Sequence, residues 1–265
     1  MVQVSVVIIT KDIAGLRAGC IEKVRTITDD VVIICNGNTV TTPDIQYQPG
    51  CRIYLKNWDG YAANKNKGID AAKYNWILSI DADEVPDDEL LHSLQQLNLA
   101  DTATVYDIKF KSYFGNKQIR FGSWGRDHHI RLFNRKLVKW SETMVHETLT
   151  LPAHVRVKKI KGAIQHYSVN NLDEFESKGI YYAKLSAKKY FRSGVRSSPI
   201  KVFLSPIFGF AKNYIFHLGF LDGREGWDIA KTAFKHTRRK YLFLSQMESF
   251  DYKHQTSDDK LAMEY

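Results

Sequence analysis

The chain has 265 residues, of which 44% are hydrophobic, 12% aromatic and 25% charged. This composition predicts a globular protein with a substantial buried core and excludes an intrinsically disordered chain. The formal net charge is +9, but residues 184–240 alone carry thirteen Lys and Arg against three Asp and Glu, a local charge of +10. We expect this C-terminal quarter to attract a polyanion, either nucleic acid or an anionic lipid surface.

The N-terminus and the cysteines predict a reducing compartment. The apolar run at residues 4–9 has no preceding basic segment and no following cleavage site of small residues, so we expect no signal peptide. Cys20, Cys35 and Cys51 are odd in number and lack C-x-x-C spacing, which supports neither a disulfide framework nor a zinc site. We therefore expect a cytoplasmic location, with the basic quarter allowing peripheral attachment to the inner face of the cytoplasmic membrane.

The first hundred residues alternate between predicted strands and helices. Apolar runs predict strands at residues 4–9, 31–34, 53–55 and 76–80, and helical spacing predicts helices at residues 16–27 and 62–73 and a further helix opening at Pro86. Parallel strands need crossover helices, and their ligands collect at the carboxyl ends of the strands. This alternation predicts an α/β fold with a nucleotide-binding half.

Beyond residue 100 the pattern changes twice. Residues 105–169 are strand-like and aromatic, and we expect them to form a second half on the same sheet, on the side of a second substrate. Helical patterns follow from residue 172. We therefore predict a catalytic domain at residues 1–170, a basic amphipathic helical extension at 171–245 and a polar tail at 246–265.

The segment at residues 202–221 is rich in aromatic and aliphatic side chains but is interrupted by Pro206 and Lys212. A helix that spans a bilayer needs roughly 20 predominantly apolar residues. Two alternatives remain open for this segment: a helix that lies in a membrane interface and a core helix of the globular domain.

The most informative local feature is Asp81-Ala82-Asp83, at the end of the strand predicted for residues 76–80. Two carboxylates on alternate residues reach one site only where the backbone bends. Mg²⁺ or Mn²⁺ takes such oxygen ligands and completes its coordination with substrate phosphates. The pair predicts a divalent-cation site, although acidic turns without a metal are also common.

Three segments in this order resemble glycosyltransferase family 2. They are SVVIITK at residues 5–11, GYAANKNKGI at residues 60–69 and WILSIDADE at residues 76–84. Within the family the chain is most similar to bacterial lipopolysaccharide core glycosyltransferases of the β-1,4-glucosyltransferase type. That likeness rests on VHE at residues 145–147, IQHYS at residues 164–168 and LGFLDGREG at residues 218–226.

The resemblance, which covers residues 4–245, implies a GT-A fold: a Rossmann-like mixed sheet flanked by helices, here with a C-terminal helical extension. It implies that a sugar moves from a nucleotide-sugar to a glycan or lipid-linked acceptor with inversion at the anomeric carbon. The acceptor would belong to lipopolysaccharide core or another bacterial surface polysaccharide, with an anionic membrane surface as a further partner and no nucleic acid.

The same resemblance implies donor-site roles for single residues. The loop of Thr10, Lys11 and Asp12 would wrap the nucleotide, and Lys65 would reach its base or ribose. The second strand ends in Cys-Asn-Gly-Asn at residues 35–38, where the family usually has Asp-Ser-Gly-Ser. Asn36 or Asn38 remains a candidate contact to the base, although this departure leaves the usual contact to uracil unassigned. A UDP-sugar is the expected donor, and GDP and dTDP stay open.

The resemblance also implies which residues bind the metal ion. Asp81 would contact the ribose and the Mg²⁺ or Mn²⁺ ion, and Asp83 would be its principal ligand. His166 would complete the metal shell or bind a phosphate, with a structural role as the alternative. Arg126 and Arg131 suit a diphosphate or an acceptor phosphate because guanidinium is a planar, permanently charged group.

An inverting displacement needs a general base for the acceptor hydroxyl. Glu147 is the candidate, because the resemblance places the base in this region, and Glu84 and Asp127 are the substitutes. The alternative is that Glu147 only pairs with a basic neighbour. Residues 222–226 (DGREG) predict a turn between helices, with acceptor seating as an alternative role.

Two other classes of protein compete with this interpretation. A nucleic-acid-binding protein would use the basic quarter, with Tyr181, Tyr182 and Tyr190 stacking on bases. It shows no recognised motif and leaves the Asp81 and Asp83 pair unexplained. A dinucleotide-binding enzyme would need G-x-G-x-x-G after the first strand, where the sequence instead reads TKDIAG.

Overall fold

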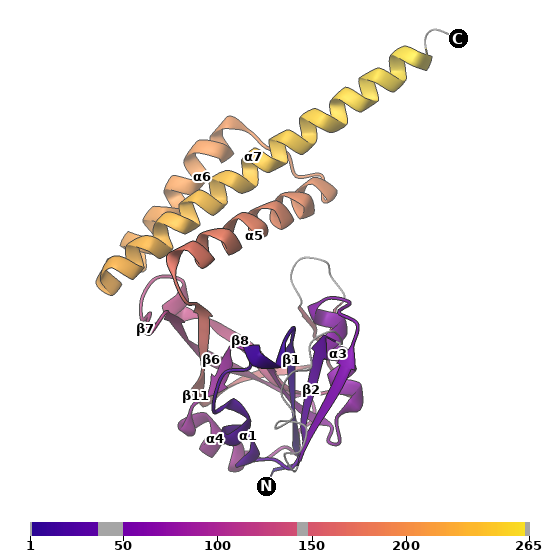
Figure 1. Ribbon diagram of the computed structural model, residues 1–265, viewed down its shortest axis with the longest axis vertical. Coiled ribbons are helices and arrows are strands. Elements are labelled where there is room, and N and C mark those ends of the chain that lie inside the picture. Colours follow the sequence, from indigo (N-terminus) through magenta and orange to yellow (C-terminus); the bar gives the residue numbers. More distant parts are fainter. Residues whose placement is uncertain (1, 37–49, 142–147, 263–265) are drawn as a thin grey trace. The chain divides into compact units, whose positions relative to one another are not determined.

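The computed structural model describes residues 2–36, 50–141 and 148–262, and it describes side chains as far as Phe250 (Figure 1). The chain forms two compact units. The first comprises residues 1–113 and 126–168, and the second comprises residues 114–125 and 169–265. Residues 114–125 thus group with the C-terminal helices, although the sequence predicted a catalytic domain continuous to residue 170.

The first unit contains most of a mixed sheet flanked by helices, as the sequence predicted. Its strands are β1 (Val4–Thr10), β2 (Val31–Asn36), β3 (Cys51–Lys56), β4 (Trp76–Asp81), β5 (Glu84–Pro86), β6 (Thr104–Phe114), β8 (His128–Asn134) and β11 (Arg156–Val169). Among the described residues they pair in the order β3-β2-β1-β4-β8-β6-β11-β5, and β7 (Lys117–Gln118) pairs with β6. A separate antiparallel pair joins β9 (Lys139–Trp140) to β10 (Leu149–Thr150).

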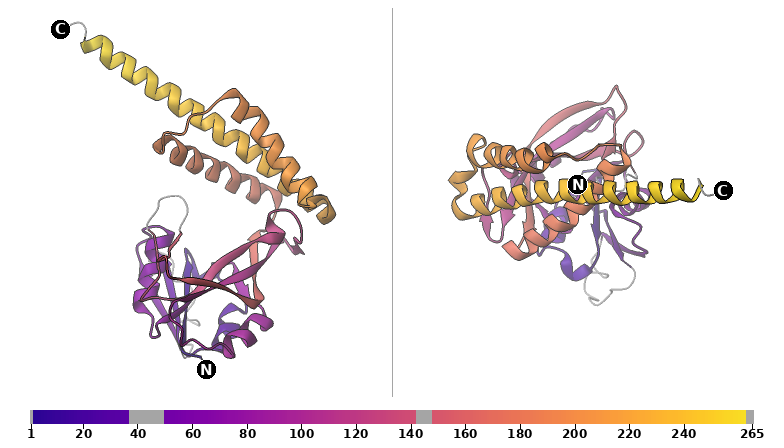
Figure 2. Two further views of the ribbon diagram at one scale, coloured as in Figure 1. Left: turned by 180° about the vertical axis from the view of Figure 1, so that it is seen from behind. Right: turned by 90° about the horizontal axis from the view of Figure 1, so that it is seen from above.

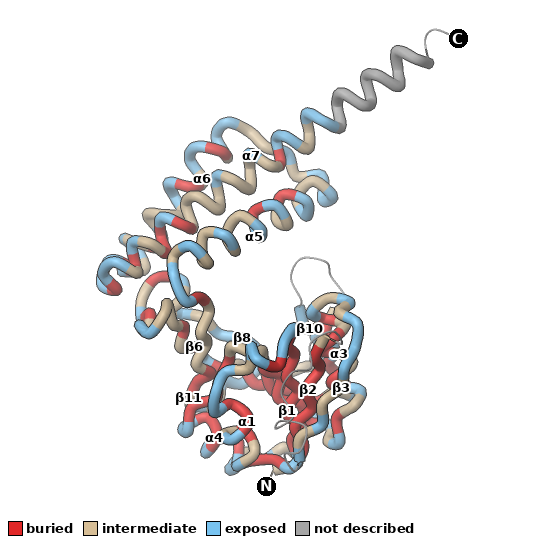
Figure 3. The backbone as a smooth tube through the Cα atoms, in the orientation of Figure 1, coloured by how far each residue is buried: buried red, intermediate tan, exposed pale blue. Residues whose placement is uncertain are grey.

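Helices cover both faces of the parallel half of this sheet. Alternate side chains of β1 enter two different cores, because successive residues of a strand point to opposite faces. Val6 and Ile8 pack with α1 (Cys20–Arg25) and α4 (Asp88–Gln95), whereas Val7 and Ile9 pack with α3 (Tyr61–Ala71). The continuous apolar runs of β1 and β2 therefore reflect burial on both faces. Both strands are coloured largely as buried in Figure 3.

Close packing of α3 on β1 depends on a glycine. A Cβ added to Gly68 would lie 2.4 Å from Val7 Cγ1 and 3.2 Å from Ile34 Cγ1. Only glycine therefore allows this approach without a shift of the helix or the strands. Gly68, the second glycine of the GYAANKNKGI segment, thus fixes the position of the helix that carries Lys65.

The antiparallel half begins with β8, which pairs with β4 and with β6. The short strand β5 pairs with β11 at the other edge, a strand that the sequence did not predict. Its Pro86 has no N–H to donate, which a strand at the edge of a sheet tolerates. Because β5 follows β4 after a turn at Ala82 and Asp83, the chain bends where the carboxylate pair stands.

The second unit is built on three helices, and Figures 1 and 2 show them side by side. α7 (Gly223–Ala262) packs against both α5 (Leu172–Arg192) and α6 (Pro199–Ala211). A π-helical turn, η3 (Lys212–Phe216), and a 3₁₀ turn, η4 (Gly219–Asp222), connect α6 to α7. α7 continues past residue 246, where the sequence predicted a polar tail, because residues 246–262 contain neither Gly nor Pro to end the helix.

The DGREG segment, for which the sequence predicted a turn between helices, joins η4 to α7: Asp222 ends η4, and residues 223–226 form the first turn of α7. Asp222 is buried, and its carboxylate accepts hydrogen bonds from the backbone N–H groups of Arg120 at 3.1 Å and Phe121 at 2.8 Å. Gly223 has a φ of 64°, which favours glycine. Gly226 contacts the preceding turn so closely that an added Cβ would lie 1.9 Å from the Gly219 carbonyl oxygen. The segment therefore has a structural role in this unit.

Candidate active site

The carboxyl ends of the three central parallel strands meet at one edge of the sheet. In the pairing register Thr10 of β1 lies opposite Cys35 of β2, and Ile9 lies opposite Asp81 of β4. The last residues of the three strands, Thr10, Asn36 and Asp81, are therefore neighbours at the edge where parallel sheets bind ligands.

Two buried cations hold the Asp81 carboxylate. Lys65 Nζ lies 3.0 Å from Asp81 Oδ1, and Arg131 Nη2 lies 3.0 Å from Oδ2. Burial alone would disfavour the ionised carboxylate, but the charges of Arg131 and Lys65 outweigh it and hold the pKa of Asp81 well below its usual range. Asp81 is therefore an anion that Lys65 and Arg131 largely neutralise.

Glu84 is the fourth member of this charge cluster. Its side chain is only 1% exposed, and its two oxygens accept hydrogen bonds from Arg131 Nη2 and from the backbone N–H of Asp81, the latter at 2.9 Å. Burial, with the nearby carboxylate of Asp81, raises the pKa of Glu84, while Arg131 acts in the opposite direction. Glu84 thus positions both Arg131 and the backbone of the carboxylate turn.

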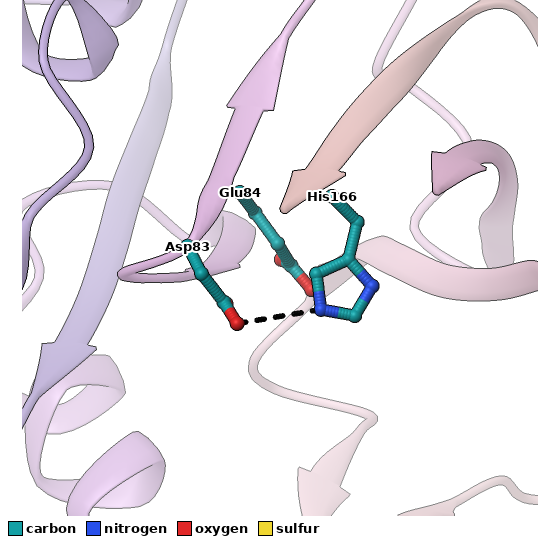
Figure 4. A group of neighbouring side chains, drawn as sticks. All are labelled: Asp83, Glu84 and His166. Atoms are coloured by element: carbon teal, nitrogen blue, oxygen red, sulfur yellow. Dashed lines mark ion pairs between the residues drawn. The ribbon is translucent and has the colours of Figure 1, made fainter. Parts of the chain in front are cut away.

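Asp83 points to a different partner. Its side chain is 44% exposed, and Oδ2 lies 3.4 Å from His166 Nε2 on β11 (Figure 4). The other ring nitrogen of His166 lies 3.1 Å from the Ser168 hydroxyl, which fixes the orientation of the imidazole. Burial alone would lower the pKa of His166, but the carboxylates of Asp83 and Glu84 raise it.

The residues around this turn fit a divalent cation. Asp83, Glu84 and His166 offer one ligand atom each within 4.8 Å of one another, a group found among the described residues; Asp81 lies outside it. Because both oxygens of Glu84 already accept hydrogen bonds, the exposed pair of Asp83 and His166 is better able to bind an ion. The Ser168 contact gives His166 the second hydrogen bond that metal-ligating histidines normally have.

The loop after β1 is ordered by its own side chains. The Thr10 hydroxyl donates to the Asp12 carbonyl, and the Asp12 carboxylate accepts from Ala14 N–H at 3.1 Å at the start of η1 (Ile13–Gly15). Lys11 is exposed and its Nζ lies 5.6 and 5.5 Å from the ring centroids of Trp58 and Tyr61. The three residues expected to wrap a nucleotide therefore stand at the ligand-binding edge of the sheet.

The remaining predicted residues are scattered. Arg131 is buried against carboxylates, whereas Arg126, at the end of the short η2 helix (Trp124–Arg126), is exposed. Asp127 pairs with His129 Nε2 at 3.0 Å, a contact that lowers the pKa of Asp127 against the effect of its partial burial. Glu147, the candidate base, lies outside the described residues, so its role stays a prediction.

A cavity of about 500 Å³ lies beside the charge cluster. Its lining includes Asp107, His128, His129, Arg131 and Trp140. Trp140 links the cavity to the carboxylate turn, because Lys65 Nζ lies 4.4 Å from its ring centroid. The buried Nε1 of Trp140 has no hydrogen-bond partner among the described residues, so a polar group of a ligand could bind there.

Two contributions were missed at the sequence level. Glu84 was considered only as a substitute base, although it adjoins Asp83 and organises the turn. Ser168 received no role, yet it stands two residues after His166 on β11, and residues two apart on a strand face the same side. That spacing could have predicted the contact between the two side chains.

Two proteins of Rickettsia resemble the chain over most of its length. The chain is 26% identical over 273 residues to an uncharacterized glycosyltransferase of Rickettsia prowazekii, covering 98% of this chain and 92% of that one. It is 26% identical over 238 residues to an uncharacterized glycosyltransferase of Rickettsia typhi, covering 86% and 81%. A shorter match, 35% identical over 85 residues, covers 32% of this chain and 21% of a TPR repeat-containing protein of Synechococcus elongatus.

The family comparison covers just over half of the chain, up to residue 151, and leaves out His166 and Ser168. The model of glycosyl transferase family 2 matches residues 5–151, which include β1, the Lys65 helix and the carboxylate turn. Proteins of this family transfer sugars from nucleotide-sugars to glycan acceptors. The chain is therefore a glycosyltransferase, and it belongs to glycosyl transferase family 2.

Proposed function

We propose that the protein is a metal-dependent inverting glycosyltransferase that takes its sugar from a nucleotide diphosphate donor. The observation that carries the proposal is that the two carboxylates at the turn after β4 have different partners. Asp81 is held by Lys65 and Arg131, whereas Asp83 turns outward to His166. One carboxylate thus belongs to a fixed internal charge cluster, and the other remains available to a ligand.

The donor binds at the carboxyl ends of β1, β2 and β4. Thr10, Lys11 and Asp12 surround the nucleotide, and Asn36 contacts the base in place of the family's usual aspartate. Lys65 and Asp81 face the ribose, and Arg131 contributes positive charge beneath the diphosphate. A UDP-sugar is the preferred donor, and Arg126 is the further candidate contact for phosphate.

Asp83 and His166 are the residues that hold Mg²⁺ or Mn²⁺. Glu84 stabilises the turn that carries Asp83. Oxygen ligands suit both ions, and the imidazole favours the softer Mn²⁺. When bound, the cation supplies Lewis-acid neutralisation of the departing diphosphate. The contribution of the chain is to fix the ligands: Ser168 orients the imidazole, and the Asp81 N–H to Glu84 bond fixes the turn.

The acceptor binds in the cavity beside Trp140, where an aromatic face and polar groups from β6 and β8 suit a sugar ring. Glu147 takes the proton of the attacking hydroxyl, so that substitution at the anomeric carbon proceeds with inversion. The acceptor is a growing bacterial surface glycan, with lipopolysaccharide core preferred on the resemblance of residues 164–168 and 218–226.

The decisive experiment screens nucleotide-sugars by thermal shift with and without Mn²⁺, because a ligand that binds only the folded state raises the melting temperature. We expect one nucleotide to stabilise the protein more strongly with Mn²⁺ than with EDTA, and the matching sugar to be transferred to a glycan acceptor. Equal stabilisation in EDTA, with undiminished transfer, would reject the metal-dependent mechanism. The configuration of the product, read by NMR, tests inversion separately.

A further inference from the structure

The second unit carries a row of exposed apolar side chains along α6. Five of them, spaced three and four residues apart, define what we call the apolar stripe: Ile200, Phe203, Leu204, Ile207 and Phe208. At 100° per residue they cover an arc of about 140° on the helix. Ile200 is 69% exposed and Phe208 67%, values that are unusual for such large apolar groups.

The opposite face of α6 accounts for the folding of this unit without the stripe. Val202 and Pro206 are buried, and α6 packs against α7. Figure 3 shows buried and exposed segments alternating along the helix. The helix therefore has two apolar faces, of which the unit itself uses one.

Exposed apolar residues continue beyond the helix, where the turns η3 and η4 present Ile215, Phe216, Phe220 and Leu221. Phe216 is 70% exposed. Leu218, between these turns, has a φ of 60°, a conformation that is strained for a bulky side chain. The chain thus maintains an unfavourable turn in the middle of a solvent-facing apolar segment.

The charges of this segment have one sign. Residues 199–221 contain no Asp or Glu, and their only ionised side chains are Lys201 and Lys212. On α6, Lys201 falls within about 20° of one edge of the apolar stripe, and Lys212 follows the helix as the first residue of η3. Arg224 follows at the start of α7, with its side chain 87% exposed. Apolar residues bordered by lysines are typical of helices that lie in the plane of a membrane, where the lysine stems lie along the apolar layer.

Charge decides between a lipid surface and a second copy of the chain. Two copies that met through this face would bring Lys201 and Lys212 of each copy toward like charges, which is unfavourable. An anionic leaflet offers the opposite charge to the same residues. No described helix is long and apolar enough to cross a bilayer, and α6 has 13 residues where a span needs roughly 20.

We infer that the apolar stripe, with Phe216, Phe220 and Leu221, inserts into the headgroup region of an anionic membrane leaflet, with α6 parallel to its surface. This attachment does not depend on the proposed donor or metal. It would hold the chain at the surface where a lipid-linked acceptor is found.

The test is co-sedimentation of the full-length chain with vesicles of phosphatidylcholine alone and of an equal mixture with phosphatidylglycerol. We expect binding to the mixed vesicles that weakens as salt shortens the Debye length from about 8 to 3 Å, and little binding to the neutral ones. The double variant Phe203→Ser/Phe208→Ser should bind at least about tenfold less. The matched control, Tyr181→Ser, removes an aromatic residue that is 60% exposed on α5 and should bind like the parent.

A charge variant separates the two parts of the inference. Lys201→Glu/Lys212→Glu leaves the apolar stripe intact and should reduce binding to the mixed vesicles at least about tenfold. Circular dichroism melting checks the folding of each variant, and Ile200→Ser/Ile207→Ser replaces the phenylalanine variant if that one unfolds. Undiminished binding of a folded stripe variant would overturn the inference. So would a parental dimer, seen by light scattering, that the stripe variant dissociates while neither protein binds vesicles.

Discussion

His166 Nε2 lies 3.4 Å from Asp83 Oδ2, and this contact joins β11 to the turn after β4. Two residues that are far apart in the chain therefore form one candidate pair of metal ligands. The pair is partly exposed, whereas Asp81 and Glu84 around it are occupied by internal partners.

The first prediction concerns this pair. Asp83→Asn and His166→Ala should each weaken Mn²⁺ binding at least about 100-fold, because the first replaces an anionic ligand by a neutral amide and the second removes the imidazole ligand. Ser168→Ala should weaken it less, by roughly tenfold, because it removes only the group that orients the imidazole. Isothermal titration with Mn²⁺ measures both effects. Asp70→Asn, which changes an exposed carboxylate on α3, serves as the control, and equal affinity in all four proteins would contradict the assignment.

The second prediction separates the two carboxylates by their effect on stability. Asp81→Ala should lower the free energy of unfolding by about 2 to 4 kcal/mol, because Lys65 and Arg131 would lose a partner while buried. Asp83→Ala should change it by no more than about 0.5 kcal/mol, because the Asp83 side chain is half-exposed. Urea unfolding of the metal-free proteins gives both values, and similar losses in the two variants would count against the division of roles.

The third prediction is a pH dependence at the start of α4. Asp87 caps this helix: its carboxylate accepts from Leu90 N–H and Ala163 N–H, both at 2.9 Å, and lies 2.7 Å from Lys111 Nζ. Burial opposes ionisation, but these contacts outweigh it and lower the pKa of Asp87 in the folded protein. The group therefore stabilises the fold above the unfolded pKa of about 3.9, and this stability is lost as the pH falls through the lower folded pKa.

Asp87→Ala should accordingly cost about 2 kcal/mol at neutral pH. The difference from the parent should shrink as the pH falls below about 4, where the carboxylate of the unfolded chain becomes protonated, and should be lost below the lower pKa of the folded protein. Urea unfolding curves recorded across this range measure it. A difference that stays constant down to the acid limit would show that the cap acts without its charge.

The fourth prediction tests the contact between the first turn of α7 and the preceding turn η4. Gly226→Ala should destabilise the second unit by more than about 3 kcal/mol, because the new Cβ would collide with the Gly219 carbonyl. Gly209→Ala in α6 is the matched control: nothing lies within 4 Å of its Cβ position, and alanine favours a helix, so stability should rise by up to about 1 kcal/mol. Thermal unfolding followed by circular dichroism distinguishes the two, and tolerance of Gly226→Ala would mean that the turn can open.

The fifth prediction concerns the proposed base. Glu147→Gln keeps the shape of the side chain but cannot take a proton, so donor affinity should persist while kcat falls by roughly 100- to 10,000-fold. Asp127→Asn should leave kcat nearly unchanged, because that carboxylate is paired with His129. Steady-state kinetics with a nucleotide-sugar donor measure both. If the two effects are reversed, Asp127 rather than Glu147 acts as the base.

The sequence by itself determined the four parallel strands, the order of the βα units and the identity of the residues at the carboxyl ends. Residues 4–9, 31–34 and 76–80 were recognisable because strands buried on both faces need continuous apolar runs. Residues 53–55 form a short apolar run in the edge strand β3, which is only partly buried. The positions of Thr10, Asn36 and Asp81 at one edge followed, since parallel strands end together. The change of direction before α7 was also readable from Gly223, because its positive φ restricts the choice of residue.

Only the tertiary structure decided what each charged side chain does. The sequence grouped Asp81 with Asp83. In the structure Asp81 pairs with Lys65 of α3 and Arg131 of β8. Asp83 instead faces His166 of β11. Those partners come from distant segments, and no local pattern encodes such pairings. The exposure of the apolar stripe was equally hidden, because helical spacing marks an apolar face without showing what covers it. Short-range patterns fix the backbone, whereas the pairing of charges and the exposure of faces depend on how the elements pack together.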